Sequence, residues 1–248
     1  MQIEVLADAD AVARKAAAMV AAESREAVLA RGRFIMAVSG GRTPWQMLRA
    51  LAGEKVLWEE VHLAQVDERL APADDPDRNL THLQDSLLKR VPLPASQVYA
   101  MPVESADLES AAKQYAATLA QAAGSPPELD LVHLGLGPDG HTASLVPGDP
   151  VLEVTDADVG VTGIYQGRRR MTLTYPIINR ARRILWVVTG GEKQEMLERL
   201  LRADRSVPAG RVRQGQAMVL ADRAAAVNLG THKSNAAGSG PSSLSQLS

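Results

Sequence analysis

The residues of this chain best suited to chemistry lie in the segment 131–148, which reads LVHLGLGPDGHTASLVPG. An apolar run ends there in a glycine-rich turn that presents Asp139 and His141 two residues apart. In α/β proteins, turns of this kind follow parallel strands and often hold catalytic groups. Histidine has an ordinary pKa of about 6.5, so a neutral imidazole is available at pH 7 to take a proton from water. Taken alone, such a motif is more often a structural turn, here with Asp139 as a cap, so other residues must decide.

A second candidate site is the segment 38–44, which reads VSGGRTP. Gly40 and Gly41 permit a tight turn with exposed amides, and Ser39 and Thr43 add hydroxyl groups. We expect Thr43 to cap a helix with Pro44 in its first turn, and a helix N-terminus attracts anions. The spacing fits neither a Walker loop nor a nucleophile elbow. An empty tight turn and a phosphate cradle are both consistent with these residues.

Charged residues follow two further apolar runs, 61–66 and 184–188, and a basic cluster precedes the second of them. Asp67, Glu68 and Arg69 come directly after the run 61–66. Lys193 ends the segment TGGEK, where a helix is expected to begin and where a lysine is mildly unfavourable unless an anion is bound nearby. The segment 179–183, NRARR, leads into the same apolar run, 184–188, and its arginines suit either a solvated face or an anion site.

The elements that must position these residues alternate between short apolar strands and helices. We expect strands at 34–38, 61–66, 99–103, from 131, and at 159–165, 171–175, 184–188 and 218–220. We expect helices at 8–30, from 43, at 79–90 and 105–123, from 192 and from 222, with a further helix start at Thr142. This order predicts a Rossmann-like α/β fold, with a mostly parallel twisted sheet flanked by helices on both faces. The carboxyl ends of such strands converge on one crevice.

Length and composition restrict the class of protein. The chain has 248 residues, which we interpret as one domain over 1–230 and a disordered, Ser/Gly-rich tail over 231–248. A net charge of -2 and 3% aromatic residues argue against nucleic-acid and membrane partners. There is no cysteine, apolar span or signal-like N-terminus, so we expect a cytoplasmic protein without disulfides. We expect a monomer or weak homodimer.

Five motifs together give the chain a close resemblance to the 6-phosphogluconolactonases. They are SGGRTP, VDER, LGLGPDGHTASLVPG, TLTYPIINRARR and TGGEK, which begin at Ser39, Val66, Leu134, Thr172 and Thr189. The resemblance runs from about Ile3 to Leu229 and places the chain in the sugar-phosphate isomerase/lactonase fold group. It implies hydrolysis of 6-phospho-D-glucono-1,5-lactone to 6-phospho-D-gluconate, in the oxidative pentose phosphate pathway, without metal or organic cofactor.

The resemblance also implies roles for individual residues. His141 would draw a proton from the water that attacks the lactone carbonyl, Asp139 would orient the imidazole or the water, and Arg69 would stabilise the oxyanion or contact the phosphate. The implied phosphate-binding residues are Ser39, Gly40, Gly41, Arg42, Thr43, Lys193 and Arg183, with Arg182 as an alternative to the last. The implied residues of the substrate pocket are Asp67, Glu68, Gly137 and Gly140.

Three alternative functions fit the sequence less well. The related glucosamine-6-phosphate deaminases carry an acid five positions after the histidine, where this chain has Val146. Sugar-phosphate sensors of this fold need a DNA-binding module, and residues 1–33 offer one helix and no basic surface. A serine esterase would need a serine in a nucleophile elbow, and the sequence offers none. The chain departs from the lactonases at Arg42, where serine is frequent, and at Gln65-Val66, where Trp-Gly is frequent.

Overall fold

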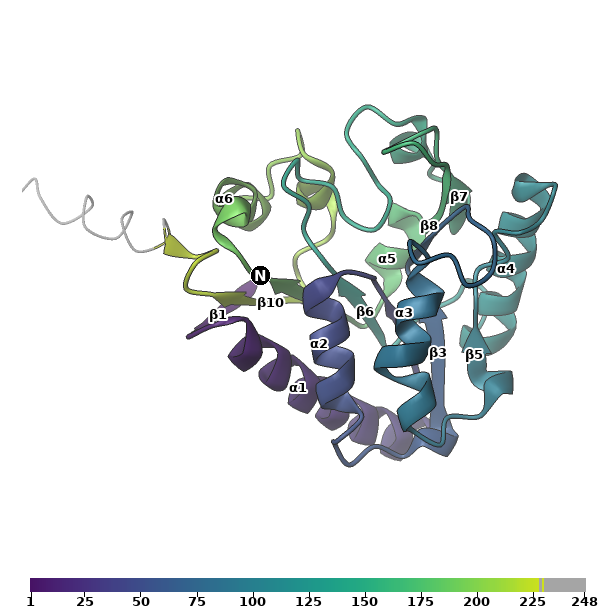
Figure 1. Cartoon of the computed structure of the whole chain (residues 1–248), viewed down its shortest axis with the longest axis horizontal. Helices are drawn as coiled ribbons and strands as arrows, with labels where there is room; N and C mark the ends of the chain where they lie inside the picture. The colour runs from purple at the N-terminus through teal and green to yellow at the C-terminus, as the bar shows by residue number, and fades with distance from the viewer. Residues whose placement is uncertain (228, 230–248) are drawn as a thin grey trace, which may run out of the picture.

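A computed structural model describes residues 1–227 and 229, and its centre is a seven-stranded parallel sheet (Figure 1). The strand order is β1-β10-β9-β6-β2-β3-β5. The bounds are β1 Gln2–Leu6, β2 Phe34–Val38, β3 Val61–Gln65, β5 Val98–Tyr99, β6 Leu131–Leu134, β9 Arg183–Val188 and β10 Ala217–Asp222. All six pairings within this sheet are parallel, which confirms the predicted fold class.

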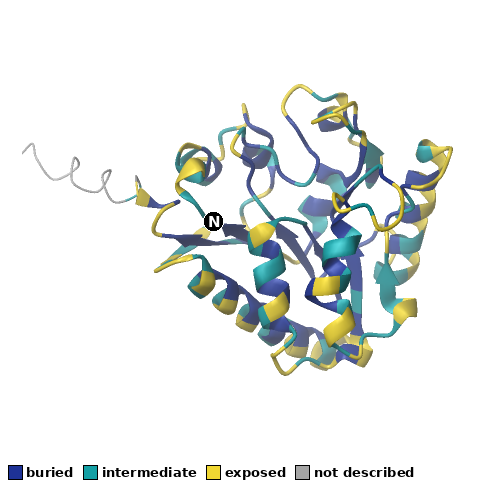
Figure 2. Ribbon diagram, viewed as in Figure 1, coloured by how far each residue is buried: buried dark blue, intermediate teal, exposed yellow. Residues whose placement is uncertain are grey.

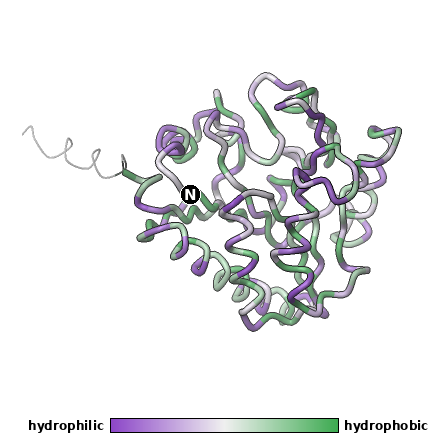
Figure 3. The backbone as a smooth tube through the Cα atoms, in the orientation of Figure 1, coloured by the Kyte–Doolittle hydropathy of each residue, from purple (hydrophilic) through white to green (hydrophobic). Residues whose placement is uncertain are grey.

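Helices cover both faces of the sheet because successive strand residues point to opposite sides. On β2, Phe34 and Met36 pack into the core beneath α1 (Ala9–Arg31), α2 (Arg42–Leu51) and α3 (Asn79–Ser86). Ile35 and Ala37 point to the other core, beneath α4 (Leu108–Ala123), α5 (Tyr175–Arg180) and α6 (Gln194–Leu201). The inner strands are therefore buried on both faces, and most exposed residues lie along the outer sides of the helices (Figure 2). Figure 3 shows the same division by hydropathy: the strands are mostly apolar, whereas the helices carry both apolar and polar residues.

Short 3-10 helices punctuate the connections. Their bounds are η1 Trp58–Glu60, η2 Leu88–Arg90, η3 Ala95–Gln97, η4 Pro150–Glu153, η5 Gly191–Lys193 and η6 Pro208–Arg211. No helix within the described residues is long and apolar enough to cross a membrane.

A second, three-stranded antiparallel sheet was not predicted. Its order is β4-β8-β7, with β4 Asp67–Arg69, β7 Val159–Val161 and β8 Arg170–Leu173. Because β4 follows β3 after only Val66, this small sheet extends from the carboxyl end of the large one. Its register places Arg69 directly opposite Arg170, which joins two segments about a hundred residues apart in the sequence.

Several predicted elements differ from the structure. β1 was missed because it is a half-exposed edge strand with a charged residue at its centre. The strand expected at 171–175 ends at Leu173, and Pro176 lies in the first turn of a helix instead. The strand expected at 99–103 ends at Tyr99, the strand expected at 159–165 ends at Val161, and residues 223–226 form a turn rather than a helix. The tail predicted at 231–248 lies outside the described residues.

Candidate active site

The candidate site lies where the connections of the sheet change direction. From β2 the chain moves outward through β3 to β5, whereas from β6 it moves the opposite way through β9 to β10. β2 and β6 are neighbours, so the segments after Val38 and Leu134 diverge and leave a crevice between them. Such a switch point is the usual ligand site of an open α/β sheet.

A cavity of about 220 Å³ occupies this crevice. Its charged and polar lining residues are Ser39, Asp67, Arg69, Asn79, His141, Arg170 and Lys193. A second hollow of about 440 Å³ adjoins it and includes Arg42, Thr43 and Thr189. The two share Gly40, Gly41, Gly135, Leu136 and Lys193, so together they form one cationic cleft.

His141 and Asp139 form a tight pair at the edge of the cavity. His141 Nδ1 lies 2.5 Å from Asp139 Oδ1, and the backbone N–H of His141 donates to the same oxygen at 3.1 Å. A carboxylate can only accept, so the proton of the neutral imidazole lies on Nδ1 and the lone pair lies on Nε2. The histidine therefore presents a basic nitrogen while its other nitrogen is held.

The charge of Asp139 is maintained by its surroundings. Partial burial pushes the pKa of this carboxyl upward, but His141 and the hydrogen bonds from His141 and Tyr165 outweigh it and hold the pKa below its usual range. Asp139 is therefore an ionised partner for the imidazole at neutral pH.

Glycines give the turn its shape. A Cβ on Gly137 would lie 2.1 Å from His141 Nδ1. Gly140 has a φ of +82°, and a Cβ there would lie 2.8 Å from Val207 Cβ. The turn closes where the Gly137 N–H donates to the His141 carbonyl at 2.8 Å. The helix expected to begin at Thr142 is absent, because the Leu145 N–H returns to the Thr142 carbonyl at 2.9 Å and closes a tight turn.

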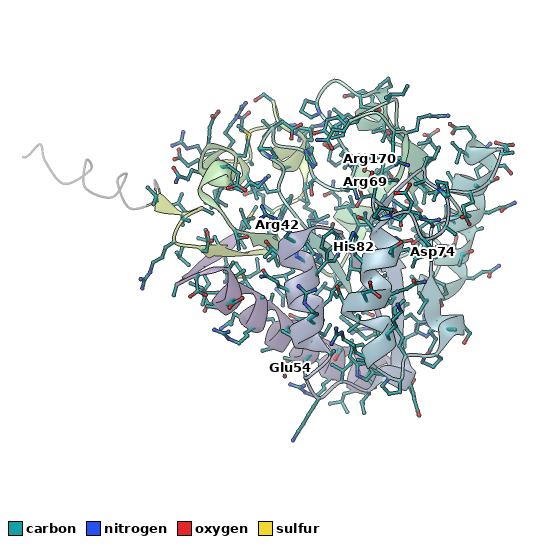
Figure 4. All side chains as sticks on the ribbon, viewed as in Figure 1. Arg42, Glu54, Arg69, Asp74, His82 and Arg170 are labelled. Atoms are coloured by element: carbon teal, nitrogen blue, oxygen red, sulfur yellow. The ribbon has the colours of Figure 1, made fainter. Side chains whose placement is uncertain are left out.

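Two arginines line the side of the cavity that the small sheet forms. Arg69 donates to the Asp77 carbonyl at 2.6 Å and to Asn79 Oδ1 at 3.1 Å. Arg170 is 5% exposed, and its Nε is buried without a hydrogen-bond partner in the described structure. Burial lowers the pKa of Arg170, while Asp67 counteracts the change. In Figure 4 the two arginines lie beside each other, and Arg42 stands apart near α2. Arg69 and Arg170 can thus meet an anion or a developing oxyanion together.

The loop before α2 supplies the other end of the cleft. Gly41 has a φ of +126°, and a Cβ on Gly40 would lie 2.0 Å from Asn79 Oδ1. α2 begins at Arg42 without a side-chain cap, so Thr43 is not the predicted cap; its hydroxyl lies 2.6 Å from that of Thr189. The first amides of α2 therefore remain available to an anion.

Lys193 joins the two halves of the cleft. It lines both hollows from η5, the 3-10 turn that precedes α6. Burial lowers the pKa of its ammonium group and Arg42 adds to this, whereas Glu192 and Asp139 act in the opposite direction. An anion between Lys193 and Arg42 would relieve the repulsion of these two cations.

The structure removes three predicted residues from the substrate and phosphate sets. Arg183 begins β9 at the opposite end of the sheet and pairs with Glu23 at 3.0 Å. Its alternative Arg182, which pairs with Glu128, lies at the same end. Glu68 is fully buried. Its carboxylate accepts the N–H groups of Asn79 and Leu80, each at 2.8 Å, and so caps α3 instead of facing substrate.

Gly140 also lies outside the cavity lining, because it is buried within the turn and its carbonyl accepts the Ala209 N–H at 2.9 Å. Its role is therefore to shape the turn. Gly137 and Asp67 do line the cavity, as do Ser39, Gly40, Gly41 and Lys193.

Four residues near the cleft were not recognised from the sequence as site residues. Asn79 and Arg170 line the cavity, and Tyr165 contacts Asp139. The fully buried His133 accepts the Ser39 N–H at 3.3 Å and thereby supports the loop before α2. Burial lowers the pKa of His133 to about 3, so this ring is neutral. The only signal for Arg170 was its place in the basic run 168–170, and nothing in the sequence distinguished it from the other two arginines.

Within residues 1–227 and 229, no group of three or more His, Asp or Glu side chains is placed to hold a metal ion.

Comparison with known proteins places this site in a family. Residues 7–221 match the family described as glucosamine-6-phosphate isomerases/6-phosphogluconolactonase. A 6-phosphogluconolactonase of Synechocystis is 36% identical over 92% of this chain and 98% of its own length. One from Mycobacterium tuberculosis is 37% identical, with the same coverage. The chain belongs to this family, as its motifs predicted.

Solved structures agree with this assignment. A 6-phosphogluconolactonase from Trypanosoma cruzi has a TM-score of 0.82 at 26% identity and covers 92% of this chain and 96% of that one. The enzyme from Thermotoga maritima has a TM-score of 0.80 at 26% identity, covering 89% and 98%. A monomeric glucosamine-6-phosphate deaminase shares the fold, with a TM-score of 0.79 at 20% identity over 92% of this chain and 99% of that one.

Proposed function

We propose that this chain opens the ring of 6-phospho-D-glucono-1,5-lactone with a water molecule activated at His141. The enzyme class is 6-phosphogluconolactonase, because relatives of that class match over nearly their whole length. The observation that carries the mechanism is the His141–Asp139 pair, 2.5 Å apart, beside a cavity lined by Arg69, Arg170 and Lys193.

The proposed hydrolysis consumes one water molecule, and His141 ends it in the neutral form in which it began. His141 Nε2 takes a proton as the water oxygen bonds to the lactone carbonyl carbon, and the carbonyl oxygen becomes an oxyanion. Asp139 stabilises the resulting imidazolium through Nδ1. The bond from that carbon to the ring oxygen then breaks, and His141 gives its proton to the departing oxygen. The product is an open-chain acid with a new hydroxyl group.

Arg69 and Arg170 would stabilise the oxyanion, and their place in the lining of the same cavity as His141 supports this role. Donors that are already in position for a developing negative charge contribute strongly to rate, typically about 3 kcal/mol each. The 6-phosphate is assigned to the other end of the cleft, with Lys193, Arg42 and the amides and hydroxyls of residues 39–43. The two anionic positions would then lie at opposite ends of one substrate.

Val146 favours the lactonase over the deaminase. The deaminases resembled by this fold need an acid at this position, and here the side chain is apolar and only 4% exposed. A buried valine offers no proton to an amino sugar. The remaining chemistry of the site, a base with cationic groups, is sufficient for an ester.

A direct test is hydrolysis of freshly generated 6-phosphogluconolactone, corrected for the spontaneous reaction. We expect the intact chain to accelerate this hydrolysis strongly. We expect it to have no effect on the hydrolysis of an acyclic phosphate ester. Binding of 6-phosphogluconate without any acceleration of lactone hydrolysis would contradict the proposal and favour a sugar-phosphate sensor.

A further inference from the structure

Tyr165 connects the catalytic pair to one of the site arginines. It lies in the loop between β7 and β8, outside both strands. Its hydroxyl is 3.1 Å from Asp139 Oδ2, and its ring meets that of His141 edge-on with centroids 5.6 Å apart. On its other side the guanidinium of Arg170 lies 4.9 Å from the ring centroid. One side chain thus contacts three groups of the site.

The hydrogen bond has only one possible direction. Asp139 is ionised and accepts, so the Tyr165 hydroxyl donates to Oδ2. Asp139 Oδ1 receives the two N–H groups of His141. The second carboxylate oxygen would otherwise be free to rotate away from the pair. The tyrosine therefore holds the carboxylate in the plane that the imidazole needs.

The loop is built to keep Tyr165 in place. Tyr165 and Arg168 exchange backbone hydrogen bonds at 2.9 and 3.3 Å, and Gln166 has a φ of +51°. Gln166 in turn accepts from Arg170 at 3.1 Å. A cation over an aromatic face is attracted to it, so Arg170 also has a preferred position against this ring.

We propose that Tyr165 is a positioning residue, whose hydroxyl fixes Asp139 for His141 and whose ring seats Arg170. Its effect on rate rests on the proposed function, but its contacts do not. The hydroxyl affects the imidazole by drawing negative charge from the carboxylate. Without it, the full charge of Asp139 acts on His141 and stabilises the protonated ring.

Other charges around His141 stay the same when the hydroxyl is removed. Arg69 lies on β4, Arg170 on β8 and Lys193 on η5. Asp67 also lines the cavity, where Ser144 donates to its carboxylate at 2.6 Å. None of these groups is altered by Tyr165→Phe, so a change in the titration of His141 reports the missing hydroxyl.

The test compares Tyr165→Phe, which removes only the hydroxyl, with Tyr165→Leu, which also removes the ring. We expect Tyr165→Phe to lower kcat about tenfold with little change in KM, the usual size for a lost hydrogen bond to a charge. We expect its pH–rate profile and the NMR titration of His141 to move to higher pH. Tyr165→Leu should lower kcat further, because Arg170, the second proposed oxyanion donor, loses its support.

Tyr99→Phe is the matched control. The Tyr99 hydroxyl shares a side-chain hydrogen bond with His62 at 2.7 Å, but Tyr99 lies on the outer strand β5, away from the cleft. We expect wild-type kinetics and an unmoved His141 titration from it. Wild-type kcat in Tyr165→Phe together with an unmoved His141 titration would overturn the proposal. The NMR titration needs no substrate, so it tests Tyr165 even if the lactone were not hydrolysed.

Discussion

The two ends of the central sheet each gather arginines around a hollow, yet only one end is equipped for chemistry. At the amino end a groove of about 310 Å³ is lined by Arg31, Arg182 and Arg183. Each of these pairs with a carboxylate, respectively Asp130 at 2.8 Å, Glu128 at 2.5 Å and Glu23 at 3.0 Å. In each pair the carboxylate neutralises the arginine, whether that carboxylate is exposed, as in Glu128, or buried, as in Asp130.

At the carboxyl end the cations are left without such partners. Among the described residues, Arg42, Arg69, Arg170 and Lys193 form no ion pair, although Asp67 and Asp139 are near. The difference shows that the number of basic residues does not mark the site. The candidate site is distinguished by cationic side chains that the fold brings together without neutralising them. They lie next to His141, whose proton is held on Nδ1 by Asp139.

The largest effect expected at the carboxyl end is that of His141→Ala. Removal of the general base should lower kcat for 6-phosphogluconolactone by about 10² to 10⁴. Binding of 6-phosphogluconate, measured by calorimetry, should persist because the cations remain. If this variant kept more than about a tenth of the activity, a loss below about 1.4 kcal/mol, His141 would not be the essential base.

Beneath the loop at the same end, His133 should make stability depend on acidity. Its pKa is about 3 in the folded chain, because of burial, and about 6.5 when unfolded. Between these pH values the unfolded chain binds a proton at His133 that the folded chain does not bind. The free energy of unfolding is therefore highest above about pH 6.5 and falls, by the order of several kcal/mol, as the pH drops toward 3. Urea unfolding at several pH values should show this slope.

His133→Leu, which fills a similar volume, should flatten that acid dependence. The control is His62→Leu, since His62 is partly exposed and contributes less. An unchanged slope in His133→Leu would assign the acid sensitivity to other groups.

Arg69→Ala and Arg183→Ala compare the two ends directly. Loss of a donor to the oxyanion should lower kcat by about 10² to 10³ for Arg69→Ala. Arg183→Ala breaks only an exposed pair at the amino end, worth at most about 1 kcal/mol of stability, and should leave lactonase kinetics unchanged. Steady-state kinetics on both variants checks this, and comparable losses would return Arg183 to the site.

Lys193→Ala should change the lactonase kinetics less than His141→Ala or Arg69→Ala does. Loss of a charged contact to phosphate should raise KM for the phosphorylated lactone about tenfold, with a weak effect on the unphosphorylated gluconolactone. Equal effects on both substrates would separate Lys193 from the phosphate.

The strands and the family could be predicted because both are written locally. Apolar runs such as 34–38 and 184–188 reveal buried parallel strands, and the turn around Asp139 and His141 is continuous in the sequence. Arg183 was misassigned for the same reason that it was noticed: a basic cluster beside a strand does not reveal which end of the strand it occupies. It precedes β9, so it lies opposite the cleft.

The sequence by itself therefore determined the fold class, the family and the proposed catalytic pair, since those depend on residues near one another along the chain. Only the tertiary structure decided which charges act together. Arg170 reaches Arg69 through the pairing of β8 with β4, and Tyr165 reaches Asp139 from the loop that precedes β8. Glu68 turns inward to cap α3 and leaves the site. Contacts between distant segments fix these outcomes, because burial and pairing, rather than residue type, determine whether a charge is free to meet a substrate.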